Sequence, residues 1–256
     1  MKNFYHILGL SIEPPPEHQL IEAAYKALVK LYHPDVYKGD KKSLKRKISE
    51  INEAYDTLSD KKKREEAFDK VVANAKIKNA GYDCLIPVSG GKDSTYQVLK
   101  LLELGVNPLC VTSTTCDLSD IGRSNIQNIK NLGVDYVEHS PNPIVRRKLN
   151  RIGLETVGDI SWPEHVGIFT IPVRAAVQHK VPLIVWGENS QNEYGGPAAA
   201  TQNKTLTRAW LEEFGGLLGL RVNDLNQSWG IEKKHLINYT YPSDKELQSV
   251  GVTGLF

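Results

Sequence analysis

From Gly81 onward, short β-prone runs alternate with longer amphipathic segments, and this alternation constrains the fold more than any other feature of the chain. The β-prone runs cover residues 82–88, 107–112, 134–138 and 182–186, and amphipathic segments fill 94–104 and 125–132. Connections of this length join parallel strands, since antiparallel neighbours need only a short turn. The pattern predicts an α/β unit with a mostly parallel, doubly wound sheet covered by helices on both faces. Pro87 lies within the first run, where it removes a ladder hydrogen bond, so we expect the strand to end there.

A glycine-rich loop follows the first predicted strand and opens the first predicted helix of this unit. It reads Ser89-Gly90-Gly91-Lys92-Asp93-Ser94. The glycines let the backbone approach an anion closely, and the helix N-terminus directs N–H groups and a positive dipole end toward it. The serines add hydroxyl groups and Lys92 adds a positive charge, while Asp93 suits a phosphate site only if it shares a magnesium ion or caps the helix. The loop predicts phosphate binding, and a strand-to-helix turn without a ligand is the alternative.

This loop has neither the Walker A spacing nor the dinucleotide-binding spacing. It resembles the SGGxDS loop of the PP-loop ATP pyrophosphatases, which have an adenine nucleotide alpha hydrolase-like fold. The resemblance implies that ATP is cleaved between its α and β phosphates and that the loop retains pyrophosphate. Residues 89–94 would bind ATP together with Thr112, which ends the second predicted strand, and Lys92 and Asp93 would take part in catalysis. The implied cofactors are ATP and Mg²⁺, the latter held by Asp93 or Glu188.

Later sequence blocks narrow the resemblance. Residues 122–126, 133–136, 158–165 and 186–196 resemble the N-acetyl sugar amidotransferases of lipopolysaccharide and surface-glycan biosynthesis, from about Asp83 to the end of the chain. That family would adenylate the N-acetyl amide of a nucleotide-linked sugar and replace its oxygen with ammonia-derived nitrogen, giving an acetamidino sugar. No cysteine here lies in a nucleophile-elbow context. The resemblance therefore implies a separate glutaminase with a cyclase-like subunit as partners, and a nucleotide sugar as substrate.

Several polar residues in these blocks are candidates for the site. The expected catalytic residues beyond the loop are Glu188 and His165, and the expected substrate contacts are Asp159, Asn189, Glu193 and Tyr194. Each of them has a plain alternative as a hydrogen-bonded loop residue or a structural histidine. The basic residues Arg146, Arg147, Lys148 and Arg151 are candidates for the diphosphate of a nucleotide sugar, although a solvated helix face explains them better.

Before Gly81 the chain has a different character. Apolar residues recur at helical spacing at Leu20, Ala24, Ala27, Leu28 and Leu31, and again at Leu44, Ile48, Ile51, Tyr55 and Leu58. Two such helices joined by a short loop form an antiparallel hairpin with one apolar seam. Proline residues 14–16 fix the start of the first helix. Ser59 and Asp60 are expected to cap a last helix that runs to about Asp69.

The hairpin resembles the DnaJ-type J domain over its whole length. The resemblance rests on blocks at residues 4–10, 25–28, 33–35 and 51–58, which include the His33-Pro34-Asp35 triplet in the loop. It implies that this triplet, with Lys26 and Lys30 on the preceding helix, contacts a DnaK-type chaperone. A J-like bundle that serves only as a structural module is the alternative. The predicted organisation is a J domain at 1–70, a linker at 71–81 and the α/β domain at 82–256.

Composition limits the remaining possibilities. A formal net charge of +2 provides no global basic field for nucleic acid. The cysteines Cys84, Cys110 and Cys116 form no CxxC pair, which argues against structural zinc and favours a reducing compartment. No apolar stretch suits a signal peptide or a membrane span, so we expect a cytoplasmic protein without membrane insertion. Members of the resembled family continue beyond the position of Phe256, so we expect a C-terminally shortened domain.

Two rival functions remain open at this level. The first is a PP-loop enzyme that thiolates tRNA, with Cys110 and Cys116 as the reactive pair near the end of the second predicted strand. The second is a non-catalytic co-chaperone whose α/β domain only senses ATP.

Overall fold

The computed structural model describes two compact units, at residues 1–73 and 74–256. The residues it describes are 3–11, 16–33, 36–37, 39–78, 81–114, 118–187, 208–214 and 217–255. Among these residues, no helix has both the length and the apolar character needed to cross a membrane.

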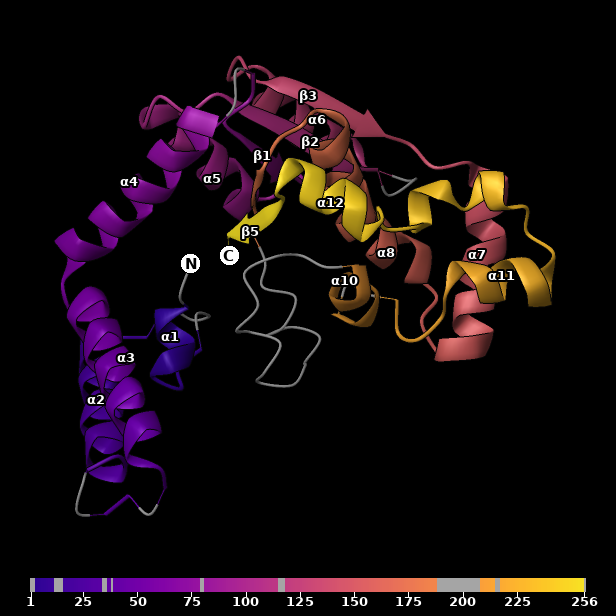
Figure 1. Cartoon of the computed structure of the whole chain (residues 1–256). Helices are drawn as coiled ribbons and strands as arrows, with labels where there is room; N and C mark the ends of the chain where they lie inside the picture. Colours follow the sequence, from indigo (N-terminus) through magenta and orange to yellow (C-terminus); the bar gives the residue numbers. More distant parts are fainter. Residues whose placement is uncertain are drawn as a thin grey trace. The chain divides into compact units, whose positions relative to one another are not determined.

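The first unit is a helical hairpin with a short preceding helix. It contains α1 (Phe4–Ile7), α2 (His18–Leu31) and α3 (Lys41–Ser59), and α2 and α3 pack along each other (Figure 1). Its core is formed by buried residues of all three segments, namely Leu8, Ile21, Ile51, Ala54 and Leu58. Tyr25 of α2 stacks on Tyr55 of α3 with 4.0 Å between ring centroids. The predicted hairpin is confirmed.

The apolar seam of α2 differs from the one expected. Leu20 and Leu31 are more than half exposed, whereas Ile21 is only 1% exposed. Ala24, Tyr25 and Leu28 pack partly buried against the same core. The buried face therefore follows positions 21, 24, 25 and 28, one residue away from the predicted register. The sequence offered two overlapping apolar faces on this helix, and only packing against α1 and α3 decides between them.

The helix after α3 is longer than predicted. Asp60 accepts a hydrogen bond from the Lys63 backbone N–H at 3.4 Å, consistent with its expected capping role. However, α4 runs over Lys61–Lys78, beyond the expected end near Asp69 and through most of the residues assigned to a linker. The segment contains neither glycine nor proline, and it is rich in alanine, lysine and glutamate, so nothing in it interrupts a helix. Near its end, Lys76 Nζ donates to the carbonyl oxygens of Leu104 and Gly105.

The second unit is built on an all-parallel sheet, as predicted. Its strands are β1 (Cys84–Pro87), β2 (Pro108–Ser113), β3 (Asp135–His139), β4 (Leu183–Val185) and β5 (Thr253–Leu255). The five strands lie in the order β3-β2-β1-β4-β5, and all four pairings are parallel. Pro87 is the last residue of β1, as expected, and the Val88 N–H donates to the Val111 carbonyl oxygen just beyond it.

Helices cover both faces of this sheet (Figure 1). Leu85, Leu109 and Val111 pack in one cluster with residues of α7 (Pro143–Val157) and α8 (Trp162–Gln178). The helices α5 (Lys92–Glu103) and α6 (Asp120–Lys130) bury their apolar residues outside that cluster. The strand order accounts for this arrangement, because connections of one hand that run from β1 to β3 and then back to β4 place the two pairs of helices on opposite faces. The result is the three-layer architecture that a buried parallel sheet requires.

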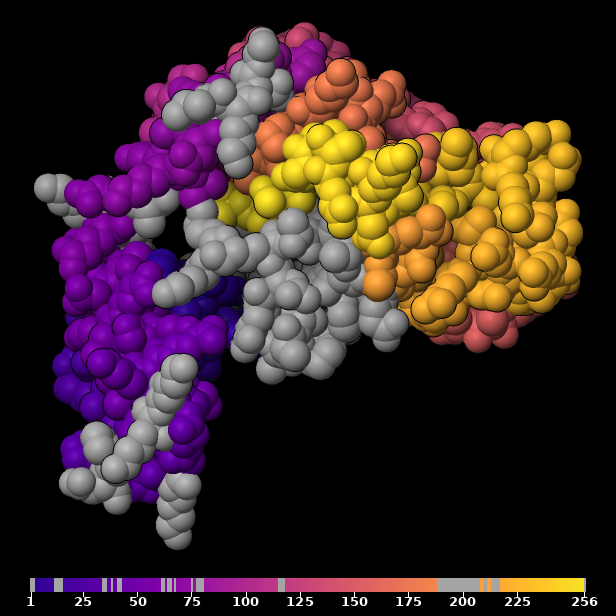
Figure 2. All heavy atoms as spheres, viewed as in Figure 1, coloured from indigo at the N-terminus to yellow at the C-terminus, as the bar shows by residue number. Residues whose placement is uncertain are grey.

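The helix α8 is apolar on nearly all sides and lies inside the unit. Trp162, Val166 and Val173 on it are 0% exposed. On its outer side lie residues from the C-terminal part of the chain, which includes α11 (Val222–Trp229) and α12 (Asp244–Val250). Trp162 Nε1 donates to the Leu217 carbonyl oxygen at 2.9 Å. Figure 2 shows this C-terminal part as a continuous yellow and orange surface.

Several elements were not predicted from the sequence. They are α7, α8, β5, the short helix α10 (Arg208–Phe214), and α11, α12, η2 (Lys233–His235) and η3 (Ile237–Tyr239). The strand β5 pairs with β4 through Leu183, Ile184 and Val185 and extends the sheet by one edge strand.

The contact between α7 and α8 depends on a glycine. A Cβ atom added at Gly153 would lie 2.6 Å from the Asp159 carbonyl oxygen and 2.6 Å from the Trp162 Cβ. We expect Gly153→Ala to lower the free energy of unfolding of this unit by about 1–3 kcal/mol, because the two helices must separate. Urea unfolding followed by tryptophan fluorescence measures this unit alone, since Trp162, Trp186, Trp210 and Trp229 all belong to it.

The matched control is Gly122→Ala in α6. Its added Cβ would lie 3.3 Å from the end of the flexible Leu118 side chain, and Ser119 Oγ would be at an ordinary contact distance of 3.6 Å. This change should be neutral or stabilise the unit by up to ~1 kcal/mol, because alanine favours the helix over glycine. Equal destabilisation by both changes would contradict the packing argument.

Candidate functional site

The glycine-rich loop lies between β1 and α5, and hydrogen bonds of its own residues hold its shape. Ser94 Oγ donates to the Gly91 carbonyl oxygen at 3.1 Å and accepts from the Ser89 N–H at 3.4 Å. The Gly91 N–H donates to Ser89 Oγ at 3.3 Å. Thr95 Oγ1 also donates to the Gly91 carbonyl, at 2.8 Å. Ser94 is buried, so its hydroxyl group organises the loop, which differs from its expected role as a direct donor to phosphate.

Gly90 satisfies two requirements of the loop. Its φ of +83° is a conformation that residues with a side chain rarely adopt. An added Cβ would also lie 3.2 Å from the Asn125 Cβ and 3.3 Å from the Ile126 backbone nitrogen of α6. The loop therefore passes close to α6.

The α5 N-terminus faces outward from this loop. Gly91 is the N-cap residue and provides no side-chain capping bond. The first N–H groups of a helix have no partner within the helix, so they are available to an anion. Lys92 and Asp93 are exposed in the first turn. Thr112 is buried in β2, opposite Glu138 of β3, so it contributes to the sheet and not to the exposed surface of the loop.

The strand order explains why this loop is a favourable place for a ligand. The chain runs from β1 to β2 and β3 on one side, and then crosses to β4 on the other side of β1. The strand order therefore reverses between β1 and β4, and ligands of such sheets bind beyond the carboxyl ends of the strands at this point. Gln97 connects α5 to the end of β4, because its Nε2 donates to the carbonyl oxygen of Trp186, the residue after that strand, at 2.8 Å. An added Cβ at Gly187 would lie 3.2 Å from Gln97 Oε1.

Some of the predicted site residues lie outside the described residues. They are Glu188, Asn189, Glu193 and Tyr194 after β4, Pro34 and Asp35 in the hairpin loop, and Cys116.

Asp159 and His165 are brought together at the start of α8. Asp159 Oδ2 lies 2.8 Å from His165 Nδ1, and Asp159 Oδ1 accepts from the Ser161 N–H at 2.8 Å. The carboxylate therefore fixes both the helix start and the imidazole ring. Pro163, Glu164 and Gly167 of the same helix line the hollow described next, and His165 does not. The geometry supports a contact in which Asp159 positions the ring of His165. It provides no support for the predicted role of His165 as a proton acceptor.

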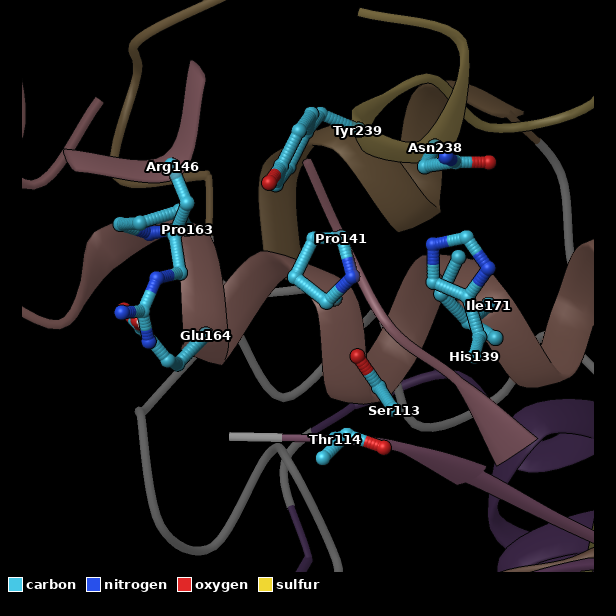
Figure 3. Close-up of a pocket in the computed structure, with 11 residues that line it drawn as sticks. Ser113, Thr114, His139, Pro141, Arg146, Pro163, Glu164, Ile171, Asn238 and Tyr239 are labelled. Carbon is cyan, nitrogen blue, oxygen red and sulfur yellow. The ribbon is translucent and has the colours of Figure 1, made fainter. Parts of the chain in front are cut away.

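A small hollow opens on the α8 side of the sheet, at the carboxyl ends of β2 and β3 (Figure 3). Its lining comes from both strand ends, from α7 and α8 and from η3: Ser113, Thr114, His139, Pro141, Arg146, Pro163, Glu164, Gly167, Ile171, Asn238 and Tyr239. Of these residues, the sequence predicted only Arg146 as a candidate for a site. The available signal was that Ser113 and His139 directly follow predicted parallel strands, at the end of the sheet where ligands bind.

The basic residues of α7 have separate roles. Arg146 Nη1 pairs with Glu164 Oε1 at 3.3 Å, and each side chain is only 16% exposed. Lys148 Nζ donates to the Trp229 carbonyl oxygen, and Arg151 pairs with Glu155 on the helix surface. Arg147 is exposed. The four residues thus form no common diphosphate site, and Arg146 alone faces the hollow.

Cys110 lies in the middle of β2 and is buried. Burial raises its pKa to about 12, and burial likewise raises the pKa of Cys84 to about 12. A reactive thiolate needs the opposite environment. In the part of the chain that the structure describes, no group of histidine, cysteine or carboxylate side chains suits a metal ion.

In the first unit, the expected docking residues lie at the end of α2. Lys26 and Lys30 are exposed, and Lys26 Nζ lies 2.6 Å from Glu22 Oε1. His33 is exposed, and its carbonyl oxygen accepts from the Val36 and Tyr37 N–H groups, both at 2.9 Å.

Comparison with known proteins identifies this unit. The family model of the DnaJ domain matches residues 3–69. The chain is 44% identical over 70 residues to a curved DNA-binding protein of Pseudomonas putida (strain W619), covering 27% of this chain and 20% of that protein. It is 46% identical over 79 residues to the chaperone protein DnaJ of Orientia tsutsugamushi (strain Boryong), covering 31% of this chain and 20% of that protein.

A further similar protein is the chaperone protein DnaJ of Carboxydothermus hydrogenoformans, 46% identical over 63 residues, or 25% of this chain and 16% of that protein. The chain thus matches a fifth or less of the length of these curated relatives. The N-terminal part of the chain is a DnaJ-type J domain, and an α/β region with a five-stranded parallel sheet follows it.

The burial of Cys110 predicts its reactivity. With a pKa near 12, the thiol stays protonated at pH 8, and the packed sheet also excludes the reagent. We expect iodoacetamide to leave Cys84 and Cys110 unmodified in the native protein and to modify both in urea, as measured by peptide mass spectrometry. Rapid labelling of Cys110 in the native protein would contradict this account and would favour an enzyme that uses Cys110 as a reactive thiol.

Proposed function

We propose that the α/β unit is an ATP-dependent amidotransferase of the PP-loop ATP pyrophosphatase type, which adenylates an amide of a nucleotide-linked N-acetyl sugar. The observation that carries this proposal is the position of residues 89–94, because this loop follows the central strand β1 at the topological switch point of the sheet. The loop combines close backbone approach at Gly90, an uncapped helix N-terminus at Gly91 and the charge of Lys92.

These features suit the pyrophosphate part of ATP. A helix N-terminus attracts anions through its N–H groups and its dipole, and a lysine adds a point charge. Asp93 is exposed beside Lys92, so its carboxylate is available to a magnesium ion on the phosphates. The self-contained hydrogen bonds of Ser89, Gly91 and Ser94 hold the loop ready for the ligand.

The proposed reaction has two steps. The amide oxygen of the acetamido group attacks the α-phosphorus of ATP, pyrophosphate leaves, and the amide nitrogen loses its proton. Ammonia then attacks the imidate carbon, and AMP departs with the former amide oxygen, leaving an acetamidino group. Adenylation is needed because an amide oxygen is a poor leaving group, whereas the phosphate of AMP is a good one. Ammonia would come from a separate glutaminase.

A tRNA-thiolating enzyme is less well supported. Its reaction needs a reactive cysteine, and Cys110 is buried in the sheet with its pKa raised to about 12. The charge of the chain also provides no general field for RNA.

A second function is proposed for the J domain, namely docking to a DnaK-type chaperone and stimulation of its ATPase. The match of the DnaJ domain model over residues 3–69 favours this function. Lys26 and Lys30 are exposed in the C-terminal half of α2 and His33 just after it, where a partner can reach them.

The amidotransferase proposal predicts measurable products. The full chain, incubated with ATP, Mg²⁺, UDP-N-acetylglucosamine and ammonium, should release AMP and pyrophosphate in equal amounts. Lys92→Met should weaken ATP binding by about 10–100-fold, since a charge-assisted hydrogen bond contributes about 1.5–3 kcal/mol. Isothermal titration calorimetry with ATP provides the measurement.

Lys100→Met is the matched control, because Lys100 lies on the same helix and pairs with Glu103 on its surface. ATP affinity should not change in this variant. If the Lys92→Met variant and the unmodified chain bound ATP with equal affinity, the loop would not be part of the ATP site. ATP binding without AMP formation would instead favour a sensing domain.

The docking proposal is tested independently. His33→Gln should abolish the stimulation of a DnaK ATPase by the full chain, measured as phosphate release in single turnover. His18→Gln, at the exposed start of α2, is the matched control and should stimulate normally. Normal stimulation by the His33 variant would exclude His33 from the docking site, and no stimulation by the unmodified chain would leave the J domain with a structural role only.

A further inference from the structure

We propose that Tyr32, Tyr37 and Lys47 form a positioning cluster that holds the docking loop of the J domain at its two ends. The docking role of this loop, which contains His33, rests on the proposed function, whereas the contacts of the cluster are independent of it. None of the three side chains belongs to the docking residues predicted from the sequence. Tyr32 directly precedes His33, and Tyr37 lies on the other side of the triplet.

The two tyrosine rings lie against each other across the ends of the loop. Their centroids are 5.5 Å apart and their planes are tilted by 47°, within the range in which aromatic pairs attract each other. The backbone closes the same span, because the His33 carbonyl oxygen accepts from the Val36 and Tyr37 N–H groups, both at 2.9 Å. The ring contact and the backbone turn therefore act on the same two ends of the loop.

A lysine of the facing helix fixes the first ring. Lys47 of α3 donates from Nζ to Tyr32 Oη at 3.3 Å, and its ammonium group lies 4.8 Å from the centre of the same ring. This separation is within the range of a cation–π contact. Tyr32 is the C-cap residue of α2, so the contact connects the end of α2 to α3 at the point where the loop begins.

The second ring packs against Gly39. A Cβ added at Gly39 would lie 2.6 Å from Cε1, Cζ and Oη of Tyr37, so the missing side chain gives the ring its place beside the backbone. Tyr32 and Tyr37 are both partly buried, although His33 between them is exposed. An ordered loop loses less conformational freedom when a partner binds it. We therefore expect the cluster to raise the affinity of the J domain for its chaperone.

The first test needs no chaperone. Lys47→Met and Tyr37→Leu should each speed the amide hydrogen exchange of Val36 by about 2–10-fold, because the turn loses a cation–π or aromatic contact. The exchange is followed by NMR on the full chain. The amides of buried core residues such as Ile51 should exchange as before, which shows that the hairpin remains folded. Lys45→Met, at an exposed position of the same helix, is the matched control for the loss of a charge and should leave Val36 unchanged.

The second test measures docking through the stimulation of a DnaK ATPase in single turnover. Lys47→Met should raise the chain concentration that gives half-maximal stimulation by about 2–10-fold, since the loop must be ordered on binding. The maximal stimulation should not change, because His33 itself is intact. Lys47→Arg should restore the half-maximal concentration, because it keeps a cation beside the ring of Tyr32. Lys45→Met should stimulate like the unmodified chain.

The two tests separate the cluster from the docking function. Unchanged exchange of Val36 in both the Lys47→Met and the Tyr37→Leu variant would overturn the cluster. Faster exchange with an unchanged half-maximal concentration would overturn its role in docking. If the unmodified chain stimulates no chaperone ATPase, the docking function fails, and the exchange rates still decide whether the cluster holds the loop.

Discussion

Parallel pairing of β1 on both of its sides is the constraint on which the second unit depends. Cys84, Leu85 and Ile86 are at most 1% exposed, and β1 pairs with β2 on one side and β4 on the other. A central parallel strand must be covered on both faces, which requires α5 and α6 on one side and α7 and α8 on the other. The same pairing places β1 at the point where the strand order reverses, which is where parallel sheets of this kind bind ligands.

The carboxyl edge of the sheet thus presents two different environments. On the α5 side, the loop at residues 89–94 presents a helix N-terminus and Lys92, which together favour an anion. On the α8 side, Arg146 pairs with Glu164, and burial lowers the pKa of His139, so this side carries little uncompensated positive charge. The sheet thus separates the helix N-terminus after β1 from a charge-balanced surface on its other face.

Sequence reasoning succeeded where structure is set locally. The strand, the glycine-rich turn and the helix at residues 84–103 follow from neighbouring residues, and so do the hairpin of α2 and α3 and the strand end at Pro87. It failed where distant contacts decide. The face of α2 depends on α1 and α3, and the hollow requires β2, β3, α7, α8 and η3 together. The strand β5 is too short and too ordinary in sequence to be recognised without β4 beside it.

The two units also differ in the range of contacts that form them. In the J domain, a core of Leu8, Ile21, Ile51, Ala54 and Leu58 joins helices that follow each other in the chain. In the α/β unit, Leu85 pairs with Ile184, and Ile184 in turn pairs with Gly254. The strands that pair are therefore far apart in the sequence, and the complete sheet needs residues from most of the unit. Local helical contacts form quickly, whereas parallel pairing across such separations is slow, because loop closure precedes any gain from the contact. The J domain has a core of its own, whereas β1 becomes a central strand only after the long-range pairing of β4 is complete.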